Sequence, residues 1–525
     1  MCRTSIPRVG APLPLLLPGA RPVDSPGSPR LSPTGDLPDR ERPARRQRFL
    51  VPVLGSCGIV AALMQTVVVP LLPDLPKLTG SSASTVSWTV TATLLSGAVC
   101  TPLLGRAGDM FGKKRMLMFA MCVLSIGSLM CALTSDIGVL IVGRALQGAA
   151  TAVVPLGISI LRDELPPAKV GAGVAMMSST LGIGAAVGLP LAGLVVDHAD
   201  WHVMFWGATA LALVVLAMIA LVVRESPVRN PGRFDVVGSI GLAAFLVCLL
   251  LGVSKGTAWG WGSGRTLALF AAALVIVLAW GVHQSRISAP LVDLRVTARP
   301  AVLLPNIAAL FIGFSFYANS LSTAQLVQTP KESGYGLGVS VAVGGLCLLP
   351  GGVMMVVLSP ISTHLTATRG PRFCLGIGSV LLALGYVVRI FTSHDLWLII
   401  LGATVVASGT AMCYSALPML VIRAIPAAQT AAANGINALM RTIGQAVCSA
   451  VVAAVLTSYT LTVGGHTLPA LHAYMVVFVI AGVVACCALV ACLCIPEPTG
   501  SATAVTGEPR KAAPARAMPD PTGRT

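Results

Sequence analysis

The sequence predicts an all-α polytopic membrane protein with about 14 transmembrane helices. Of its 525 residues, 55% are hydrophobic and only 10% are charged, and the mean hydropathy is +0.85. A soluble domain carries roughly a quarter of charged residues. Apolar runs of about 20 residues, long enough to cross a bilayer as helices, recur along the chain. A large soluble protein is excluded because too few polar residues remain to cover its exterior.

Each apolar run is expected to be a helix because lipid offers the backbone no hydrogen-bond partner outside the segment itself. Short loops join the runs, so consecutive helices should pack antiparallel. The predicted spans lie near residues 49–72, 85–105, 115–134, 137–160, 170–196, 202–223, 236–254, 266–283, 301–322, 338–358, 373–392, 396–421, 431–457 and 473–495.

The distribution of lysine and arginine over the loops predicts the orientation. Loops after even-numbered spans hold 15 of these residues, whereas loops after odd-numbered spans, with the span ends included, hold 5. The positive-inside rule therefore places the even loops and both termini in the cytoplasm. The net charge of +16 is mostly this topology signal and does not indicate a nucleic-acid surface. A multi-pass protein of a bacterial plasma membrane is expected.

A weak internal repeat predicts two related halves. Residues 136–153 align with 395–412 at an offset of 259, and residues 177–182 align with 439–444 at an offset of 262. The fourth and fifth spans thus match the twelfth and thirteenth, so two extra spans must lie between the halves. The predicted domains are disordered cytoplasmic tails at 1–48 and 497–525, six-helix halves at 49–223 and 301–496, and a linker with the extra pair at 224–300.

The segment 105–115, GRAGDMFGKKR, concentrates charge and glycine between two apolar runs. A phosphate-binding loop would need G-x-x-x-x-G-K-[ST]. Ala107 stands where the first glycine should be, and Lys114 follows Lys113 in place of a hydroxyl residue. Nucleotide binding is therefore excluded, and the segment is a cytoplasmic hairpin between the second and third spans.

Several motifs resemble those of the major facilitator superfamily, and of its fourteen-span drug:proton antiporters in particular. They cover roughly residues 49–496. The motifs are Gly105, Asp109, Gly112, Lys113 and Lys114 in the hairpin, VGRALQGAATA at 142–152, GIGAAVGLPLAGLV at 182–195, DWHVMFW at 200–206, and the segments 234–252 and 285–296 of the extra helix pair. The resemblance implies two halves that rock around a midplane cavity.

The resemblance implies that the hairpin is a latch between the halves, formed by Gly105, Asp109, Gly112, Lys113, Lys114 and Arg115. Its glycines permit a tight turn. Asp109 can accept hydrogen bonds from a helix N-terminus of the other half. The basic residues can pair with carboxylates or lipid phosphates. The alternative is a plain positive-inside anchor, which needs neither the aspartate nor the glycine spacing.

Two basic residues, Arg144 and Arg441, are expected inside spans. A guanidinium in the membrane is costly unless it faces protein or water, so each is a functional candidate. Arg144 matches the superfamily's span-four arginine, which implies proton handling or substrate contact, and Gln147 lies one turn later on the same face. A structural role in binding backbone carbonyls stays open for both arginines.

The fifth span resembles the antiporter motif of the superfamily. Gly182, Gly184 and Gly188 are expected to line one face and allow close helix approach. Pro190 stands one position later than in the family pattern, which can shift the helix kink. The motif residues in this chain are Gly184, Gly188, Pro190 and Gly193.

No aspartate or glutamate lies in the middle of a predicted span, although proton antiport usually needs a titratable carboxylate near the cavity. Met64 replaces the aspartate that the family typically has in span one. The candidate proton carriers are therefore peripheral: Asp74 first, then Asp109.

A large, mostly apolar cavity with a few polar groups would suit an amphipathic organic substrate. The candidate cavity residues are Met64, Gln65, Phe311, Phe314, Tyr317, Asn319, Tyr414 and Asn437. Most of them can serve helix packing instead.

The leading functional prediction is a monomeric secondary exporter of drugs, antibiotics or dyes that works by exchange with protons. The alternative is an uncoupled or substrate-gradient-driven facilitator, or an exporter of one specific metabolite, an anionic one included. No cofactor or metal is expected. A membrane enzyme is excluded because the sequence offers no paired acids, metal cluster or nucleophile–base set near one interface.

Overall fold

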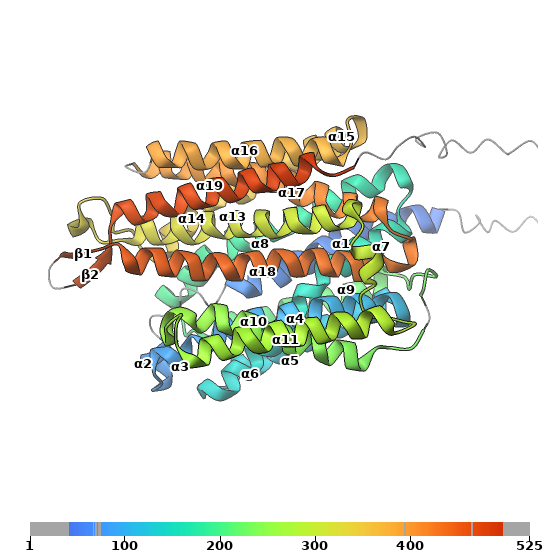
Figure 1. Cartoon of the computed structure of the whole chain (residues 1–525), viewed down its shortest axis with the longest axis horizontal. Helices are drawn as coiled ribbons and strands as arrows, with labels where there is room; N and C mark the ends of the chain where they lie inside the picture. Colours follow the sequence, from blue (N-terminus) through green and yellow to red (C-terminus); the bar gives the residue numbers. More distant parts are fainter. Residues whose placement is uncertain are drawn as a thin grey trace, which may run out of the picture. The chain divides into compact units, whose positions relative to one another are not determined.

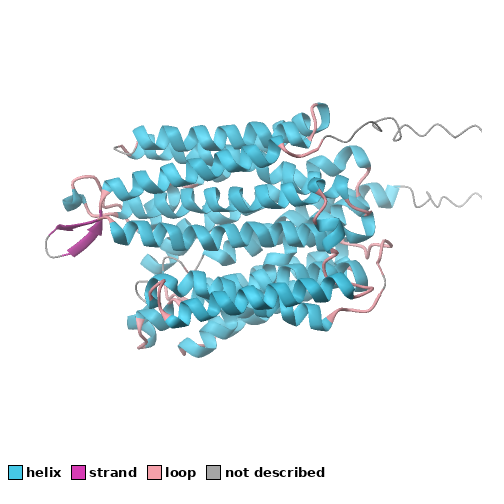
Figure 2. Cartoon of the chain, in the orientation of Figure 1, coloured by secondary structure: helices cyan, strands magenta, loops and turns pink. Residues whose placement is uncertain are grey.

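The computed structural model describes residues 41–66, 68, 71, 75–230, 232–392, 395–463 and 466–496. This part of the chain is almost entirely helical, and its long helices run side by side (Figures 1 and 2). By length and composition, 14 helical stretches can cross a membrane. The predicted fold class is therefore confirmed, with helix ends that differ from the predicted ones by a few residues in most cases.

The first part of the chain runs from α1 to the extra helix pair, α10 and α11. They are α1 (Glu41–Thr66), α2 (Leu75–Thr79), α3 (Ala83–Val86), α4 (Trp88–Phe111), α5 (Lys113–Ala132), α6 (Ile137–Gly148), η2 (Ala149–Ala152), α7 (Val153–Glu164), α8 (Pro167–His198), α9 (His202–Val222), α10 (Val236–Trp259) and α11 (Gly264–Arg286).

The remaining elements include one short antiparallel hairpin, which is an exception to the all-α prediction. They are α12 (Leu294–Thr297), α13 (Pro300–Gln328), η3 (Lys331–Ser333), α14 (Val341–Leu346), α15 (Leu349–Thr368), α16 (Pro371–Phe391), α17 (Leu396–Ala424), η4 (Ala427–Gln429), α18 (Thr430–Ser458), β1 (Thr460–Val463), β2 (His466–Pro469) and α19 (Leu471–Leu493).

The structure describes only the last part of the predicted N-terminal tail, and there it differs from the prediction. Residues 41–48, which the sequence analysis assigned to the tail, form the first turns of α1, because the run of charged and polar residues there has good helix propensity. The rest of both predicted tails lies outside the described residues.

Proline explains two interruptions of the predicted spans. The fourth span passes from α6 to α7 through the 3₁₀ turn η2, just before Pro155. The tenth span is broken between α14 and α15, directly before Pro350. A proline removes one backbone donor and crowds the preceding turn, so both breaks fall where the regular ladder cannot continue.

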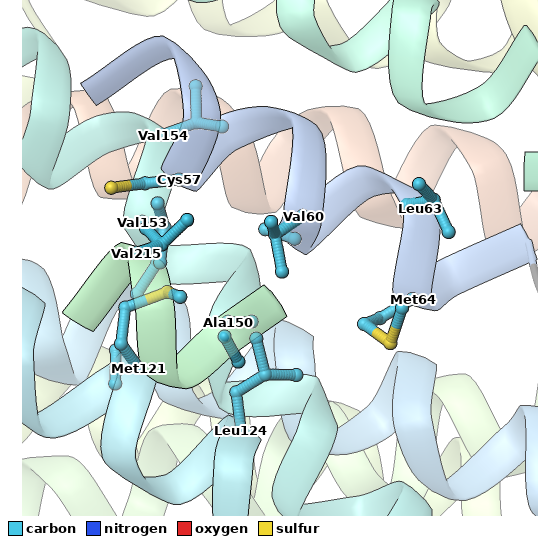
Figure 3. Packing of buried hydrophobic residues seen from close by; sticks show 14 of the residues in the cluster. Cys57, Val60, Leu63, Met64, Met121, Leu124, Ala150, Val153, Val154 and Val215 are labelled. Carbon is cyan, nitrogen blue, oxygen red and sulfur yellow. The ribbon is translucent and has the colours of Figure 1, made fainter. Parts of the chain in front are cut away.

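Two large apolar cores lie in the two parts of the chain that the repeat predicts. One is built mainly from α1, α4 to α9, and Figure 3 shows part of it around Cys57, Val60 and Met121. The other is built from α13 to α19. We propose that these cores mark the two six-helix halves, 49–223 and 301–496, with 224–300 as the linker.

The extra helix pair attaches to both proposed halves through one helix. Leu242, Leu246 and Leu250 of α10 form a small core with Ala98 of α4 and Leu439 of α18. Helix α11 packs chiefly on α10. It leaves a row of aliphatic side chains exposed, including Leu274, Val275 and Leu278. Such a face is expected where a helix borders lipid.

Helix α8 approaches neighbouring helices closely through its glycines, on two faces rather than the predicted one. A Cβ atom on Gly184 would lie 2.4 Å from Ala62 Cβ, and one on Gly188 would meet Thr66, both in α1. Gly182 instead faces Met355 of α15, and Gly193 faces Ala342 of α14. The prediction of one shared face was wrong for Gly182, because two residues along a helix turn the side chain by about 200°.

We expect Gly184→Ala to destabilise the protein. The added Cβ would lie 2.4 Å from Ala62 Cβ and 2.8 Å from the Ile59 carbonyl oxygen, so α8 must move away from α1. Overpacking of this kind costs about 1–3 kcal/mol. Thermal unfolding of the purified protein in detergent would measure the loss. Gly207→Ala in α9 is the control, since a Cβ there meets no atom within 4 Å. Equal melting temperatures of the two variants would contradict this account of α8.

Candidate functional site: a central cavity and a latch

A cavity of about 150 Å³ lies between the two proposed halves. Helices α1, α4, α6 and α8 line it on one side, and α13, α15, α17 and α18 line it on the other. Its surface is mostly apolar. Among the residues predicted from sequence, those that reach it are Gln65, Tyr317, Asn319, Tyr414, Arg144 and Arg441.

Arg144 is fixed to the first helix by its guanidinium. The side chain is 1% exposed, and Nη1 donates to the Met64 carbonyl oxygen at 2.8 Å and to Gln147 Oε1 at 2.5 Å. Gln147 in turn donates to Ser128 Oγ at 3.0 Å. The Nε–H of Arg144 has no hydrogen-bond partner in the described structure. The arginine thus combines a structural contact with a free donor at the cavity wall.

Arg441 enters the cavity from the other proposed half. Its Cζ lies 4.9 Å from the centroid of the Tyr414 ring, which is the geometry of a cation–π contact. The Tyr414 ring also packs against Phe316 at a centroid distance of 5.7 Å. The Tyr414 hydroxyl is buried without a hydrogen-bond partner among the described residues.

Three residues predicted for the cavity lie in helix contacts instead, as does Phe311. The Met64 side chain packs in the first apolar core beside Val60 and Leu63 (Figure 3). Phe314 belongs to the second core. Asn437 Nδ2 donates to Asn306 Oδ1 at 3.0 Å and so ties α18 to α13. For these side chains the sequence gives the right helix but not the side that faces the cavity.

The prediction that only two basic residues lie inside spans was wrong. Arg389 lies in α16 and is 1% exposed. It hydrogen-bonds the side-chain oxygen of Asn319 and lies 4.2 Å from the Phe478 ring centroid. Lys255 in α10 is also buried and donates to Ser87 Oγ. Both sit within a few residues of a predicted span end, where hydropathy does not separate an interfacial residue from a buried one.

The latch residue Asp109 contacts the opposite proposed half directly. Its carboxylate is fully buried and accepts hydrogen bonds from the backbone N–H groups of Ala431 at 3.2 Å and Ala432 at 2.8 Å. These donors belong to the first turn of α18, which has no intrahelical acceptor for them. The negative charge also suits the positive end of the helix dipole. Asp109 therefore joins α4 to α18.

Three further latch residues shape the turn around Asp109. A Cβ on Gly105 would lie 2.7 Å from the Ala431 carbonyl oxygen, so only glycine allows this approach of α4 to α18. Gly112 adopts φ +119°, which favours glycine. Lys113 is fully buried, and its Nζ lies 2.6 Å from Asp163 and 3.8 Å from Asp109.

Sequence analysis missed three charged partners of the latch. Asp163 receives Lys113 and Ser226. Glu225 accepts from the backbone N–H groups of Lys114 at 3.1 Å and Arg115 at 3.2 Å, which caps α5. Arg162 crosses to the other half, where it donates to Thr430 and the Ile425 carbonyl. All three residues lie in loops after even-numbered spans or at the ends of those spans, which were predicted to share one side of the membrane. This shared side could have identified them as possible partners of the latch.

The described spans hold carboxylates only at the latch end. These are Asp109 in α4 and Asp163 and Glu164 in α7, and no acid lines the central cavity. Asp74, the first candidate proton carrier, lies outside the described residues.

Outside the spans, Asp235 fixes the end of the extra helix pair. It caps α10 by accepting from Gly238 N at 2.8 Å, and it also accepts from Gln284 Nε2 at 2.7 Å and contacts His283 Nε2 at 3.1 Å. Burial raises the pKa of this carboxyl, but these hydrogen bonds and the nearby histidine outweigh it, so the pKa is lowered overall. The ionised form therefore holds α10 and α11 together.

The two proposed halves, the cavity between them and the contact of Asp109 with α18 lie in a part of the chain that matches one protein family. The model of the Major Facilitator Superfamily matches residues 54–449 and, a second time, residues 308–520. The chain belongs to the Major Facilitator Superfamily. It is therefore a multi-pass membrane transporter, and members of this superfamily bind small-molecule substrates.

Similar curated proteins are named for drug resistance, transport or export. The chain is 26% identical over 418 residues, 79% of its length and 77% of the relative, to the multidrug resistance protein Stp of Mycobacterium tuberculosis. It is 27% identical over 440 residues, 81% of its length and 74% of the relative, to a probable actinorhodin transporter of Streptomyces coelicolor. It is 28% identical to the tetracenomycin C resistance and export protein of Streptomyces glaucescens over 62% of this chain and 60% of that one.

Solved structures of the superfamily share the fold. The human organic anion transporter MFSD10 is 15% identical with a TM-score of 0.61, over 85% of this chain and 99% of that one. The proton:xylose symporter XylE is 14% identical with a TM-score of 0.61, over 86% of this chain and 97% of that one. At these identities the likeness concerns the fold alone.

Proposed function

We propose that this protein exports hydrophobic or amphipathic organic compounds, such as drugs, antibiotics or dyes, by alternating access in exchange for protons. The observation that carries the proposal is a mostly apolar cavity between two helical halves, with a latch that joins the halves at one end. The names of the relatives, which include multidrug resistance and antibiotic export, support the substrate class.

The latch end is proposed to face the cytoplasm, together with both chain termini, in the plasma membrane of a bacterium. Lysine and arginine concentrate in the loops of this end, as the positive-inside rule requires. Breaking the Asp109–α18 contact would open the cavity to the cytoplasm, and remaking it would close that side. The protein is proposed to work as a monomer, since each monomer holds both halves of the cavity.

A second candidate is transport without proton coupling. The part of the cavity lining that the structure describes contains no carboxylate that could bind and release a proton. In that case the substrate gradient or the membrane potential alone would drive movement.

Transport by inverted membrane vesicles separates these candidates. Vesicles that contain the protein should accumulate members of a panel of dyes and antibiotics, and vesicles without it should not. If protons are coupled, an ionophore that collapses the pH gradient should stop accumulation. Unchanged accumulation after collapse of the pH gradient would support the uncoupled candidate. Failure to accumulate any compound of the panel would contradict the proposed exporter.

We expect Asp74→Asn to uncouple transport from protons if Asp74 is the carrier, because the amide cannot bind and release a proton. Substrate movement down its own gradient should persist while substrate-dependent alkalinisation of the vesicle lumen disappears. A pH-sensitive dye inside the vesicles measures this. Undiminished proton flux in the variant would rule out Asp74 as the carrier.

Asp200→Asn is the matched control for Asp74. It is an exposed aspartate beside the end of α8, and it lies within hydrogen-bond distance of His202. This substitution should leave the proton flux unchanged.

A further inference from the structure

The charges that line the central cavity all have one sign. Arg144 lies in α6 and Arg441 in α18, and these guanidiniums are the only ionised groups among the lining residues that the structure describes. Arginine stays protonated in proteins. With no carboxylate among the described lining residues, the field of these residues is positive, and low-dielectric walls concentrate it.

Several of the hydrogen-bond donors at this cavity also lack acceptors. The Nε–H of Arg144 and the hydroxyl of Tyr414 are buried without partners in the described structure. The Arg441 guanidinium has no hydrogen bond or ion pair to a described residue; its contact is with the Tyr414 ring. A buried donor without a partner is unfavourable, so a ligand that brings acceptors is favoured.

The remaining lining fits a flat apolar body. Phe316, Tyr317 and Tyr414 offer aromatic surface, while Leu181, Leu348 and Met355 offer aliphatic surface. Aromatic faces and polarisable sulfur suit an unsaturated ring system. The cavity thus combines a cationic, donor-rich part with an apolar part.

We propose that the transported compound is an amphipathic aromatic anion, whose carboxylate, sulfonate or phenolate lies between Arg144 and Arg441. This inference rests on the proposed exporter function and specifies its substrate class. The two arginines belong to opposite proposed halves, so an anion between them can pair with both and reduces their mutual repulsion. An organic cation would add to the positive charge of the cavity and would find no carboxylate among the described lining residues to pair with.

The charge of the substrate also bears on the driving force. With an inside-negative potential, the movement of a negative charge out of the cytoplasm is favourable. An anion exporter can therefore use the membrane potential and needs no proton-binding carboxylate at its cavity. The absence of such a group from the lining is consistent with this substrate class.

Two dyes with one tricyclic skeleton and opposite charge test the proposal. Fluorescein, at a mildly alkaline pH where it is anionic, and cationic tetramethylrhodamine methyl ester are titrated onto the purified full-length protein and followed by fluorescence polarisation. We expect fluorescein to bind at least about tenfold more tightly, which corresponds to about 1.4 kcal/mol. Arg441→Gln should weaken fluorescein about tenfold and strengthen the cationic dye.

Control variants separate charge from folding. Arg441→Lys keeps the charge and should retain most fluorescein binding, although it loses the planar contact with Tyr414. Arg423→Gln, an exposed arginine near the end of α17 and outside the cavity, should bind both dyes as the wild type does.

Tighter or equal binding of the cationic dye, binding of neither dye, or unchanged fluorescein affinity in a folded Arg441→Gln protein would overturn the assignment. The vesicle panel decides the exporter function separately. Movement of cationic compounds there, together with failure of fluorescein to bind, would retain the exporter and remove the anionic substrate.

Discussion

Asp109→Asn is expected to reduce transport to less than about a tenth of the wild-type rate while the protein still inserts into the membrane. The buried carboxylate accepts from two N–H groups in the first turn of α18. Asparagine keeps one acceptor oxygen, loses the charge and turns an NH₂ group toward those donors. A hydrogen bond to a charged group is worth about 1.5–3 kcal/mol. Loss of about 2–3 kcal/mol shifts a two-state equilibrium by roughly 30- to 150-fold.

How often the contact between Asp109 and α18 opens can be measured independently of transport. Deuterium uptake at residues 427–435, the start of α18, should rise in Asp109→Asn because that end of the cavity opens more often. Asp136→Asn is a matched control, since Asp136 also caps a helix, accepting from Val139 N at 2.9 Å, but lies in an exposed turn. Asparagine caps helices about as well as aspartate. Normal efflux from a well-expressed Asp109→Asn protein would leave only the reading of the segment as a charged anchor.

The sequence predicted the helices well because the membrane imposes a simple rule on them. Apolar length alone locates a span, and most predicted boundaries, such as 202–223 for α9 (His202–Val222), lie close to the structure. The two aspartates aligned by the internal repeat also occupy the same place in their helices: Asp136 and Asp395, 259 residues apart, stand directly before α6 and α17. The hairpin β1–β2 was missed because its strands are only four residues each and lie in a polar loop.

Which side of a helix faces the cavity was harder to predict. Gln65 lines the cavity while its neighbour Met64 packs in the core, although hydropathy treats their helix as one apolar run. The tilt and rotation of each helix depend on contacts between helices, such as Gly184 against Ala62, that no single segment encodes. The partners of the latch were missed for a similar reason: Glu225 lies 110 residues beyond Arg115 in sequence.

Arg144→Ala is expected to abolish transport, and Arg144→Lys to impair it strongly. The alanine variant leaves the Met64 carbonyl and Gln147 Oε1 without their donor, and each unsatisfied buried group costs about 1–3 kcal/mol. It also removes one of the two positive charges of the cavity. Lysine retains a charge and can donate to Met64, but it lacks the planar fork whose Nε–H is free at the cavity wall.

Stability and transport, measured on the same variants, distinguish the functional from the structural role of Arg144. A purely structural arginine predicts that lysine restores both the melting temperature and transport. If the free Nε–H binds the substrate, lysine should restore the melting temperature but not transport. Transport should then stay at roughly a tenth of the wild-type rate or less, which corresponds to a loss of about 1.4 kcal/mol or more of transition-state stabilisation. Arg265→Ala, an exposed arginine at the start of α11, is the control and should match the wild type in both measurements. Full transport by a stable Arg144→Ala protein would show that the cavity does not need this guanidinium.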